Sequence, residues 1–499
     1  IIDLSSDDYF MGEALRQAMR AWEAGEVPIG AVIVHEGRII ARAFNQVELL
    51  NDATAHAEML ALTAAEGALG NWRLTGCTLF VTKEPCPMCA GAMVHCRLDR
   101  VVFGAPDPKG GAAGGAMNLL QHGGLNHHCT ITAGVSVTAL TQGFSASHRH
   151  PAIEYATRAR TDRVAQLHAK LRAGDTTLAF DGDQGFLRAL LDALDIPVES
   201  QTLVFSGTSL QSDFIGPDNP RAIYFTDDVA VAWIRGAPAI ELAAHDPTQG
   251  VMFYVLRQRA RGPRGFERPR ACVECHVSDV TLGVPGLAVG SVVIDADGIP
   301  YSSRPVDQRT PIESRWGGWY VTGRTGTGPH VGNTIAADPD EPVLRIDETN
   351  LNLHSVEDRF DTTGYLAPYS DVAALMVLEH QTHMTNLLTR TAWEFRVATH
   401  EGRLTRGIFA APRALADPVL RTAVRTLVDY MLFIDEAPLT DAIVGTAGFE
   451  AVFAQRGPFD RLGRSLREID LNRRLFRYPC SYMIYTAAFT ALPADARSA

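Results

Sequence analysis

Three residues whose side chains bind zinc, His56, Cys86 and Cys89, stand near one acidic residue, Glu58. Zinc prefers imidazole and thiolate ligands, and a catalytic zinc site uses three protein ligands and leaves the fourth position to water. Bound zinc lowers the pKa of that water towards neutrality and makes it a nucleophile. Glu58 lies two residues from His56, close enough to take up the proton of the water and pass it on. The pattern predicts a hydrolytic zinc site with Glu58 as the catalytic proton carrier.

The alternative is a structural zinc site, which a fourth protein ligand normally closes. The nearby candidates for a fourth ligand are Cys77, His95 and Cys96. The order His-x-Glu followed by Pro-Cys-x-x-Cys is, however, typical of hydrolytic base deaminases, in which water attacks an amidine carbon of the base. A Cys-x-x-Cys at the start of a helix also lets both sulfurs face one ion, and the helix N-terminus favours thiolates. We therefore favour the catalytic interpretation.

The segments around these residues alternate between strand-like and helix-like patterns. They predict helices over 6–24, 54–68 and 87–95, a β-hairpin over 29–35 and 38–44, and strands over 77–82 and 100–104. The helix over 54–68 would carry His56 and Glu58 in its first turn. Both metal-binding motifs would then lie at strand-to-helix transitions, a usual place for sites in open α/β sheets. We expect a three-layer α/β/α domain over residues 1–142.

Residues 8 to about 135 contain long stretches, beyond the metal motif, that match the sequence pattern of one enzyme family. These stretches are EVPIGAVIV, NDATAHAEMLAL, NWRLTGCTLFVTKEPCPMCAGAMVHCRLDRVVFGAPDPKGGAAGG and LNHHCTITAGV, together with Asn45. On them the sequence resembles the bacterial tRNA-specific adenosine deaminases, which have the cytidine deaminase-like fold.

The resemblance implies a zinc cofactor, conversion of the wobble adenosine in the tRNA anticodon loop to inosine, and a homodimer formed through this domain. It implies that Asn45 contacts the flipped nucleoside; from its position alone, Asn45 would be a turn residue after a strand. The loop from Asp107-Pro108-Lys109 to Gly114 is similar to one that separates the tRNA enzymes from relatives acting on free bases and nucleosides. Asp107 and Lys109 are therefore predicted to bind substrate.

The sequence departs from the family pattern in two places, one a single residue and the other a segment. Ala53 replaces the usual proline before Thr54. After Gly134 the chain reads SVTALTQGFSASHRHPAIEY, where family members carry a helix rich in aromatic residues and arginines, and Phe144 and Arg149 are its candidate remnants. Aromatic stacking and phosphate contacts contribute much of the affinity for splayed-out RNA bases. Deamination of a free base or nucleoside is therefore an alternative function.

Length and composition set wider limits. A chain of 499 residues suggests two to four domains. The net charge of −12 does not by itself favour RNA binding, because nucleic-acid binders usually carry a basic surface. No run of 18 or more apolar residues predicts a membrane span. The acidic start IIDLSSDDYF does not resemble a signal peptide. We expect a cytoplasmic location.

A second motif, Cys272-Val273-Glu274-Cys275-His276, has the form of a c-type haem attachment sequence, in which two thiols bond to the haem and the histidine ligates iron. The alternatives are a chance Cys-x-x-Cys pair or half of a zinc site. Residues 150–495, with LVFSGTSLQSDFI, ACVECH, RWGGWYVTG and LEHQTHMTNLLTR, resemble an uncharacterised family of bacterial cytochrome c domain proteins. Haem c is therefore expected as a second cofactor. Met384, His383 and His380 are candidates for the sixth iron ligand, and Met384 would give the higher potential. His380 and Met384 could equally form one face of a packed helix.

For this second region we predict an α+β fold. Residues 200–260 and 288–325 read as β-rich, and 370–396 and 414–434 as helical, which gives a mainly helical C-terminal part. Haem c is normally attached outside the cytoplasmic membrane, whereas tRNA is in the cytoplasm, where cysteine thiols normally stay reduced. The two motifs therefore point to different compartments. The second hypothesis is therefore a haem-binding electron-transfer or sensor protein with a vestigial deaminase domain. We favour the deaminase, whose motif set is complete.

Overall fold

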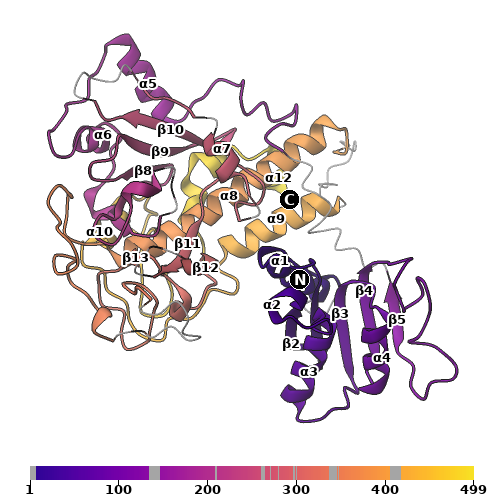
Figure 1. Cartoon of the computed structure of the whole chain (residues 1–499). Helices are drawn as coiled ribbons and strands as arrows, with labels where there is room; N and C mark the ends of the chain where they lie inside the picture. The colour runs from indigo at the N-terminus through magenta and orange to yellow at the C-terminus, as the bar shows by residue number, and fades with distance from the viewer. Residues whose placement is uncertain are drawn as a thin grey trace. The chain divides into compact units, whose positions relative to one another are not determined.

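The chain divides into two compact units in the computed structural model, Ile1–Gly143 and Phe144–Ala499, here called unit 1 and unit 2 (Figure 1). The structure describes residues 7–133, 147–207, 209, 211–259, 265–269, 271–278, 280–295, 298, 300–336, 346, 348–404 and 417–499. Most of the segment after Gly134, where family members carry a helix, lies outside these ranges, and so does Phe144.

Unit 1 is built on a five-stranded sheet of order β2-β1-β3-β4-β5. The β1–β2 and β1–β3 pairs are antiparallel, whereas β3, β4 and β5 run parallel. The strands are β1 (Gly30–His35), β2 (Arg38–Phe44), β3 (Cys77–Lys83), β4 (Arg100–Ala105) and β5 (Thr130–Ala133). The helices are α1 (Asp7–Glu23), α2 (Val47–Leu50), α3 (Ala57–Leu69) and α4 (Pro87–His95).

Alternating strand residues give the sheet of unit 1 two apolar faces, and helices cover both. On one face Val32, Val34, Phe80 and Val102 pack against Phe10, Met11 and Ala14 of α1. On the other face Ile33, Leu79, Val81 and Val101 pack with residues of α3 and α4. Because strand side chains alternate between faces, burial on both sides requires the near-continuous apolar strands seen in the sequence. Unit 1 is thus a three-layer arrangement.

Turn chemistry explains where the elements of unit 1 begin and end. Glu36 and Gly37 form the two-residue hairpin turn, both with positive φ (48° and 74°), as the tight turns of hairpins require. Helix α3 begins at Ala57, later than the predicted residue 54. The side chain of Asp52 accepts the backbone N–H of Thr54 (2.8 Å), and this turn keeps the residues before Ala57 out of the helix. His56 is therefore the residue that precedes the helix, in an extended conformation, and only Glu58 lies in the first turn.

Unit 2 contains a six-stranded antiparallel sheet of order β10-β9-β8-β7-β6-β13 and a separate β11–β12 hairpin. Its strands are β6 (Thr202–Val204), β7 (Arg221–Phe225), β8 (Val229–Trp233), β9 (Ala239–Asp246), β10 (Gly250–Arg257), β11 (Val289–Ile294), β12 (Pro300–Val306) and β13 (Trp319–Tyr320). One face of the large sheet packs against α5 (Arg163–Ala173) and α6 (Leu187–Ala193), where Leu167 and Leu187 join the core. The short helix α7 (Ala271–His276) carries the Cys-x-x-Cys-His motif.

The central helix of unit 2, α8 (Val372–His400), is buried along most of its length, and α9 (Pro418–Met431) packs beside it. These are the helices predicted over 370–396 and 414–434. Shorter α-helices in the described C-terminal part are α10 (Phe449–Gln455), α11 (Ala487–Thr490) and α12 (Ala494–Ser498). Among the described residues, no helix combines the length and the apolar character that a membrane span needs.

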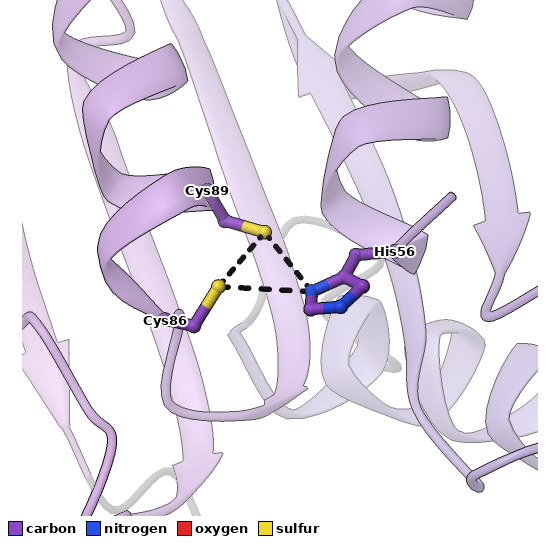
Figure 2. Close-up of side chains that lie close together, drawn as sticks. All are labelled: His56, Cys86 and Cys89. Atoms are coloured by element: carbon purple, nitrogen blue, oxygen red, sulfur yellow. Dashed lines mark hydrogen bonds between the residues drawn. The ribbon is translucent and has the colours of Figure 1, made fainter. Parts of the chain in front are cut away.

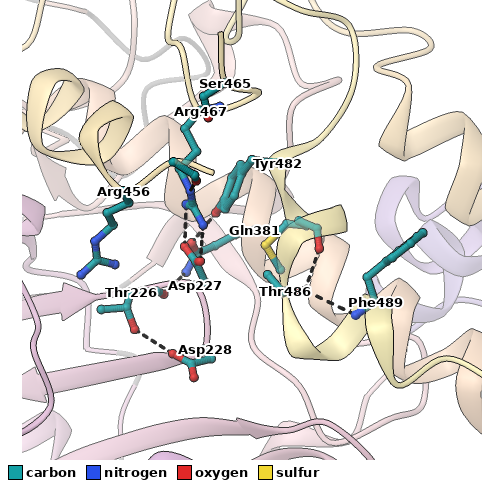
Figure 3. Close-up of polar contacts among 12 residues, drawn as sticks. Thr226, Asp227, Asp228, Gln381, Arg456, Ser465, Arg467, Tyr482, Thr486 and Phe489 are labelled. Atoms are coloured by element: carbon teal, nitrogen blue, oxygen red, sulfur yellow. Dashed lines mark hydrogen bonds and ion pairs between the residues drawn. The ribbon is translucent and has the colours of Figure 1, made fainter. Parts of the chain in front are cut away.

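A polar network joins the sheet of unit 2 to α8 and to the C-terminal segment that follows α10 (Figure 3). The guanidinium of Arg467 binds both carboxylate oxygens of Asp227, which follows β7, and stacks over the ring of Tyr482 at 4.6 Å. The Tyr482 hydroxyl donates to Oε1 of Gln381 on α8 (2.7 Å), and Nε2 of Gln381 donates to the carbonyl of Thr226 (2.9 Å). A paired and hydrogen-bonded charge of this kind can stay buried.

Candidate metal centre and active site

The side chains of the candidate site of unit 1 come from one edge of its sheet. The registers pair Phe44 with Gly30, Ala31 with Val81, and Lys83 with Ala105, so β2, β3 and β4 end, and β1 begins, at the same edge. Helices α3 and α4 start just beyond it. Sites in open α/β sheets form at such an edge, because strand ends and helix N-termini meet there.

His56 and Cys86 occupy equivalent places, each directly before the first residue of its helix, and Cys89 lies in the first turn of α4 (Figure 2). Pro87 stands at the first helical position of α4, where its missing N–H costs no hydrogen bond. Neither His56 nor Cys86 uses its side chain to cap its helix. Both side chains therefore remain directed at one another.

The three ligand atoms form a small triangle. Nδ1 of His56 lies 3.6 Å from Sγ of Cys86 and 3.5 Å from Sγ of Cys89, and the two sulfurs are 3.6 Å apart. Ligands of a tetrahedral zinc ion, with Zn–N and Zn–S bonds of about 2.0–2.3 Å, stand about 3.5–3.8 Å from one another. Donor types and spacing both fit zinc.

The structure also bears on the alternative of a closed structural site. Among the described residues, only His56, Cys86 and Cys89 form a group of histidine, cysteine or acidic side chains with ligand atoms close enough to share a metal ion. Cys77 begins β3 and Cys96 follows the end of α4, so both lie away from the helix starts. Three protein ligands leave a fourth position for water, as catalytic zinc sites do.

Glu58, in the first turn of α3, is only 3% exposed. Burial raises the pKa of Glu58 to about 7. Its Oε2 has no hydrogen-bond partner among the described residues. The contact with Cys89 lowers the pKa of Cys86 to about 5, while that contact and burial raise the pKa of Cys89. A buried carboxyl group with a pKa near neutrality is suited to taking up and releasing a proton.

Asn45 directly follows β2 and is 3% exposed. Its Nδ2 donates to Oε2 of Glu26 over 2.9 Å, and Oε1 of Glu26 accepts the backbone N–H of Leu49 over 2.8 Å. The next residue, Gln46, donates its backbone N–H to the carbonyl of Ala55, beside His56 (3.0 Å). Asn45 is therefore held next to the segment that carries the histidine.

Asp107 and Lys109 lie in the loop after β4. Nζ of Lys83 approaches Oδ2 of Asp107 at 2.8 Å, and Oδ1 accepts the backbone N–H groups of Lys109 and Gly110. The Lys83 side chain, helped by these N–H groups, lowers the pKa of Asp107 to about 2. Lys109 is exposed. The backbone N–H of Ala112, further along the loop, donates to the carbonyl of Pro85 (2.8 Å), beside Cys86.

Sequence reasoning missed two buried carboxylates at this edge, Glu26 and Glu84, both 4% exposed. Glu26 orients Asn45, and Glu84 accepts backbone N–H groups of the loop after β4. The one available signal was position, since Glu26 stands just before β1 and Glu84 just before Pro85-Cys86.

The residues proposed for haem lie in unit 2. Nδ1 of His276 is 3.0 Å from the carbonyl of Gly286, and the ring stacks on Phe253 at 4.3 Å between centroids. Cys272 packs in the same apolar cluster as Phe253. The structure does not describe the side chain of Cys275. Met384 is fully buried in a different cluster. Both ring nitrogens of His380 are already engaged, with Gln308 and Ser481.

A family model described as the cytidine and deoxycytidylate deaminase zinc-binding region matches residues 4–105. This match confirms the predicted cytidine deaminase-like α/β fold for the first part of the chain.

The tRNA-specific adenosine deaminase of Bacillus subtilis (strain 168) is 55% identical over 132 residues, which are 26% of this chain and 82% of that protein. The tRNA-specific adenosine deaminase of Aquifex aeolicus (strain VF5) is 52% identical over 120 residues, 24% of this chain and 80% of that protein. A solved structure from studies of A-to-I editing by tRNA:A34 deaminases is 45% identical, covers 26% of this chain and 94% of that one, and has a TM-score of 0.26. The chain belongs, through this first part, to the tRNA-specific adenosine deaminase family. The resemblance of residues 150–495 to cytochrome c domain proteins stays a prediction.

Proposed function

We propose that unit 1 hydrolyses adenosine to inosine at the wobble position of the tRNA anticodon loop. The observation that carries this proposal is the triangle of His56, Cys86 and Cys89 beside the buried Glu58, within a chain 55% identical to a tRNA-specific adenosine deaminase over 132 residues. His56, Cys86 and Cys89 would hold zinc, which supplies a Lewis acid that makes water nucleophilic near neutral pH.

Glu58 moves the proton in this reaction. Its carboxylate takes a proton from the attacking water, whose oxygen bonds to C6 of the adenine. Glu58 passes this proton to N1 of the ring, and the second proton of the water, now on the C6 hydroxyl, goes to the amino group through Glu58, so that the C6–N6 bond breaks, ammonia leaves and the carbonyl of inosine forms. A pKa near 7 lets Glu58 both accept and donate this proton. Asn45, Asp107 and Lys109 are proposed to hold the flipped nucleotide and its neighbours.

The test is direct. The purified full chain is incubated with a tRNA that has adenosine at the wobble position, and inosine is measured by nucleoside mass spectrometry. We expect inosine from the wild type and none from Glu58→Ala, which should keep its zinc. A zinc-loaded, folded wild type that makes no inosine would refute the proposal. Free adenosine, cytidine and guanine in parallel reactions test the alternative of a free base or nucleoside as substrate.

Two features of the family are part of the proposal. A tRNA substrate implies a cytoplasmic location, and the resemblance implies a homodimer formed through unit 1. Light scattering on the eluting full chain should give twice the mass of one chain, and a single-chain mass at micromolar concentration would exclude the dimer.

A second candidate function is haem c binding at Cys272, Cys275 and His276, for electron transfer or sensing. The observation that favours it is the contact of His276 with the Gly286 carbonyl, because an Nδ1–H donated there leaves Nε2 as the free ligand atom. The position of Met384 in another cluster does not support it as the sixth ligand. A Soret band that resists acid-acetone extraction after expression with the haem-attachment machinery would support this function, and its absence would end it.

A further inference from the structure

Glu84, the residue that links β3 to Pro85-Cys86, is the acceptor for three backbone N–H groups of one loop. Its Oε2 accepts from Asp107 (2.8 Å), and its Oε1 accepts from Ala113 (3.0 Å) and Gly115 (2.7 Å). The carboxylate is 4% exposed, so these N–H groups take the place of water. Converging backbone N–H groups form a site for an anion, and here the anion is the Glu84 carboxylate.

The loop fits this carboxylate closely enough to require glycine. A Cβ atom placed on Gly111 would lie 2.2 Å from Cδ of Glu84, and one on Gly115 would lie 2.5 Å from its Oε2 and 2.4 Å from the carbonyl oxygen of Asp107. By contrast, a Cβ atom on Gly123, a few residues further along, would meet nothing within 4 Å. Gly111 therefore serves the close approach of the backbone to Glu84, and Gly115 serves the close approach both to Glu84 and to the Asp107 carbonyl.

The same loop carries Asp107 and Lys109, and it is tied to the metal-binding segment on both sides of Glu84. Lys83 contacts the Asp107 carboxylate, and the Pro85 carbonyl accepts the N–H of Ala112. Glu84 is thus the central one of three consecutive residues that fix the loop against the start of α4.

We propose that Glu84 is a positioning residue that holds the loop from Asp107 to Gly115 in its RNA-binding conformation, and so determines the affinity for tRNA without taking part in the chemical step. This inference rests on the proposed function of unit 1. Loss of the contacts should weaken tRNA binding, because Asp107 and Lys109 lose their fixed place. The metal ligands keep their own supports on α3 and α4.

Glu84→Gln is the sharpest variant, because it keeps the shape of the side chain. The amide oxygen of Gln can still accept from Ala113 and Gly115. Its NH₂ group then faces the N–H of Asp107, and because both groups are donors, this hydrogen bond is lost. Glu36→Gln, the same change in the exposed hairpin turn, is the control. Gly111→Ala disturbs the loop from the other side, and Gly123→Ala is its matched control.

The full chains are compared by zinc content, by KM and kcat for tRNA, by the Kd for tRNA in a Glu58→Ala background, and by hydrogen exchange of the loop amides. We expect Glu84→Gln and Gly111→Ala to raise KM and Kd about 10-fold or more, since a lost or opposed buried hydrogen bond has effects of this size. Zinc content and kcat should stay near wild type, and the Asp107 amide should exchange faster in Glu84→Gln.

An active wild type whose Glu84→Gln variant keeps the same KM and Kd would overturn this inference and leave the proposed function standing. A fall in kcat and zinc content with unchanged Kd would also overturn it, because Glu84 would then support the metal centre. A zinc-loaded wild type that neither binds tRNA nor makes inosine would remove the proposed function and this inference together.

Discussion

The amide of Asn45 is fixed by Glu26, whose Oε2 lies 2.9 Å from its Nδ2. Because a carboxylate only accepts hydrogen bonds, this contact determines which end of the amide faces Glu26 and leaves Oδ1 directed elsewhere. The other carboxylate oxygen holds the N–H of Leu49, so Glu26 also anchors α2.

Glu26→Gln should therefore reduce activity on tRNA about 10-fold, because the Gln amide places a donor opposite either Asn45 or Leu49. The measurement is kcat/KM for inosine formation. The double variant Glu26→Gln/Asn45→Asp restores a donor–acceptor pair at this contact and should recover thermal stability but not activity. Recovery of activity would mean that Asn45 has only a structural role.

Loss of one of the three predicted ligands should abolish zinc binding by unit 1. Cys89→Ser is expected to lower zinc from about one ion per chain to a small fraction, because one of the three ligands is lost. Cys96→Ser changes a buried thiol just beyond the other end of the same helix and should retain zinc. Elemental analysis of the purified chains decides between the two outcomes, and zinc loss in both variants would contradict the assignment.

Acid should destabilise unit 2 through His380. Gln308 donates its Nε2 to the Tyr430 carbonyl, so its Oε1 faces the His380 ring and accepts from Nδ1, while Nε2 of His380 contacts Ser481. Burial lowers the pKa of His380 to about 3, whereas an unfolded chain has a histidine pKa of about 6.5. The unfolded state then binds the proton first, so the stabilisation is complete above pH 6.5 and is lost as pH falls towards 3.

This single group contributes a slope of up to about 1.4 kcal/mol per pH unit below pH 6.5. Denaturant unfolding followed by tryptophan fluorescence at several pH values measures it. His380→Gln should lower the stability at pH 7.5 and flatten the slope. An unchanged slope would show that the proton is taken up elsewhere.

The Asp227–Arg467 pair should matter far more than an exposed ion pair. Arg467 is 5% exposed and Asp227 23% exposed, so Asp227→Asn leaves a largely buried cation without its counter-charge. The expected loss of unfolding free energy is about 3 kcal/mol. Glu267→Gln breaks the exposed pair with Arg257 and should cost less than about 1 kcal/mol. Equal effects of the two changes would contradict this ranking.

The sequence was most informative where residue type and spacing together indicate one chemistry. His56, Cys86 and Cys89 were predicted as ligands from type and spacing, and the structure brings their ligand atoms together. The second strand of the hairpin runs from Arg38 to Phe44 as predicted, since strand alternation and the Glu36-Gly37 turn are local signals.

Contacts made by the backbone were not predictable. The partners of Glu84 are N–H groups 23 to 31 residues away, and every residue type except proline offers such a group. Glu26 and Asn45 are 19 residues apart and meet only after the hairpin has formed. The four-residue elements α2 and β5 were missed because they are too short to show a period.

The glycines that face Glu84 have a consequence for evolution. A side chain at position 111 and a carboxylate at position 84 exclude each other sterically, and a loop without that carboxylate has no need of glycine at 111. Position 115 differs, because a Cβ atom there would also lie 2.4 Å from the carbonyl oxygen of Asp107, so this position requires glycine whichever residue stands at 84. Positions 84 and 111 should therefore change together among related proteins, so that a relative with another residue at 84 also carries a larger residue at 111, while glycine persists at 115.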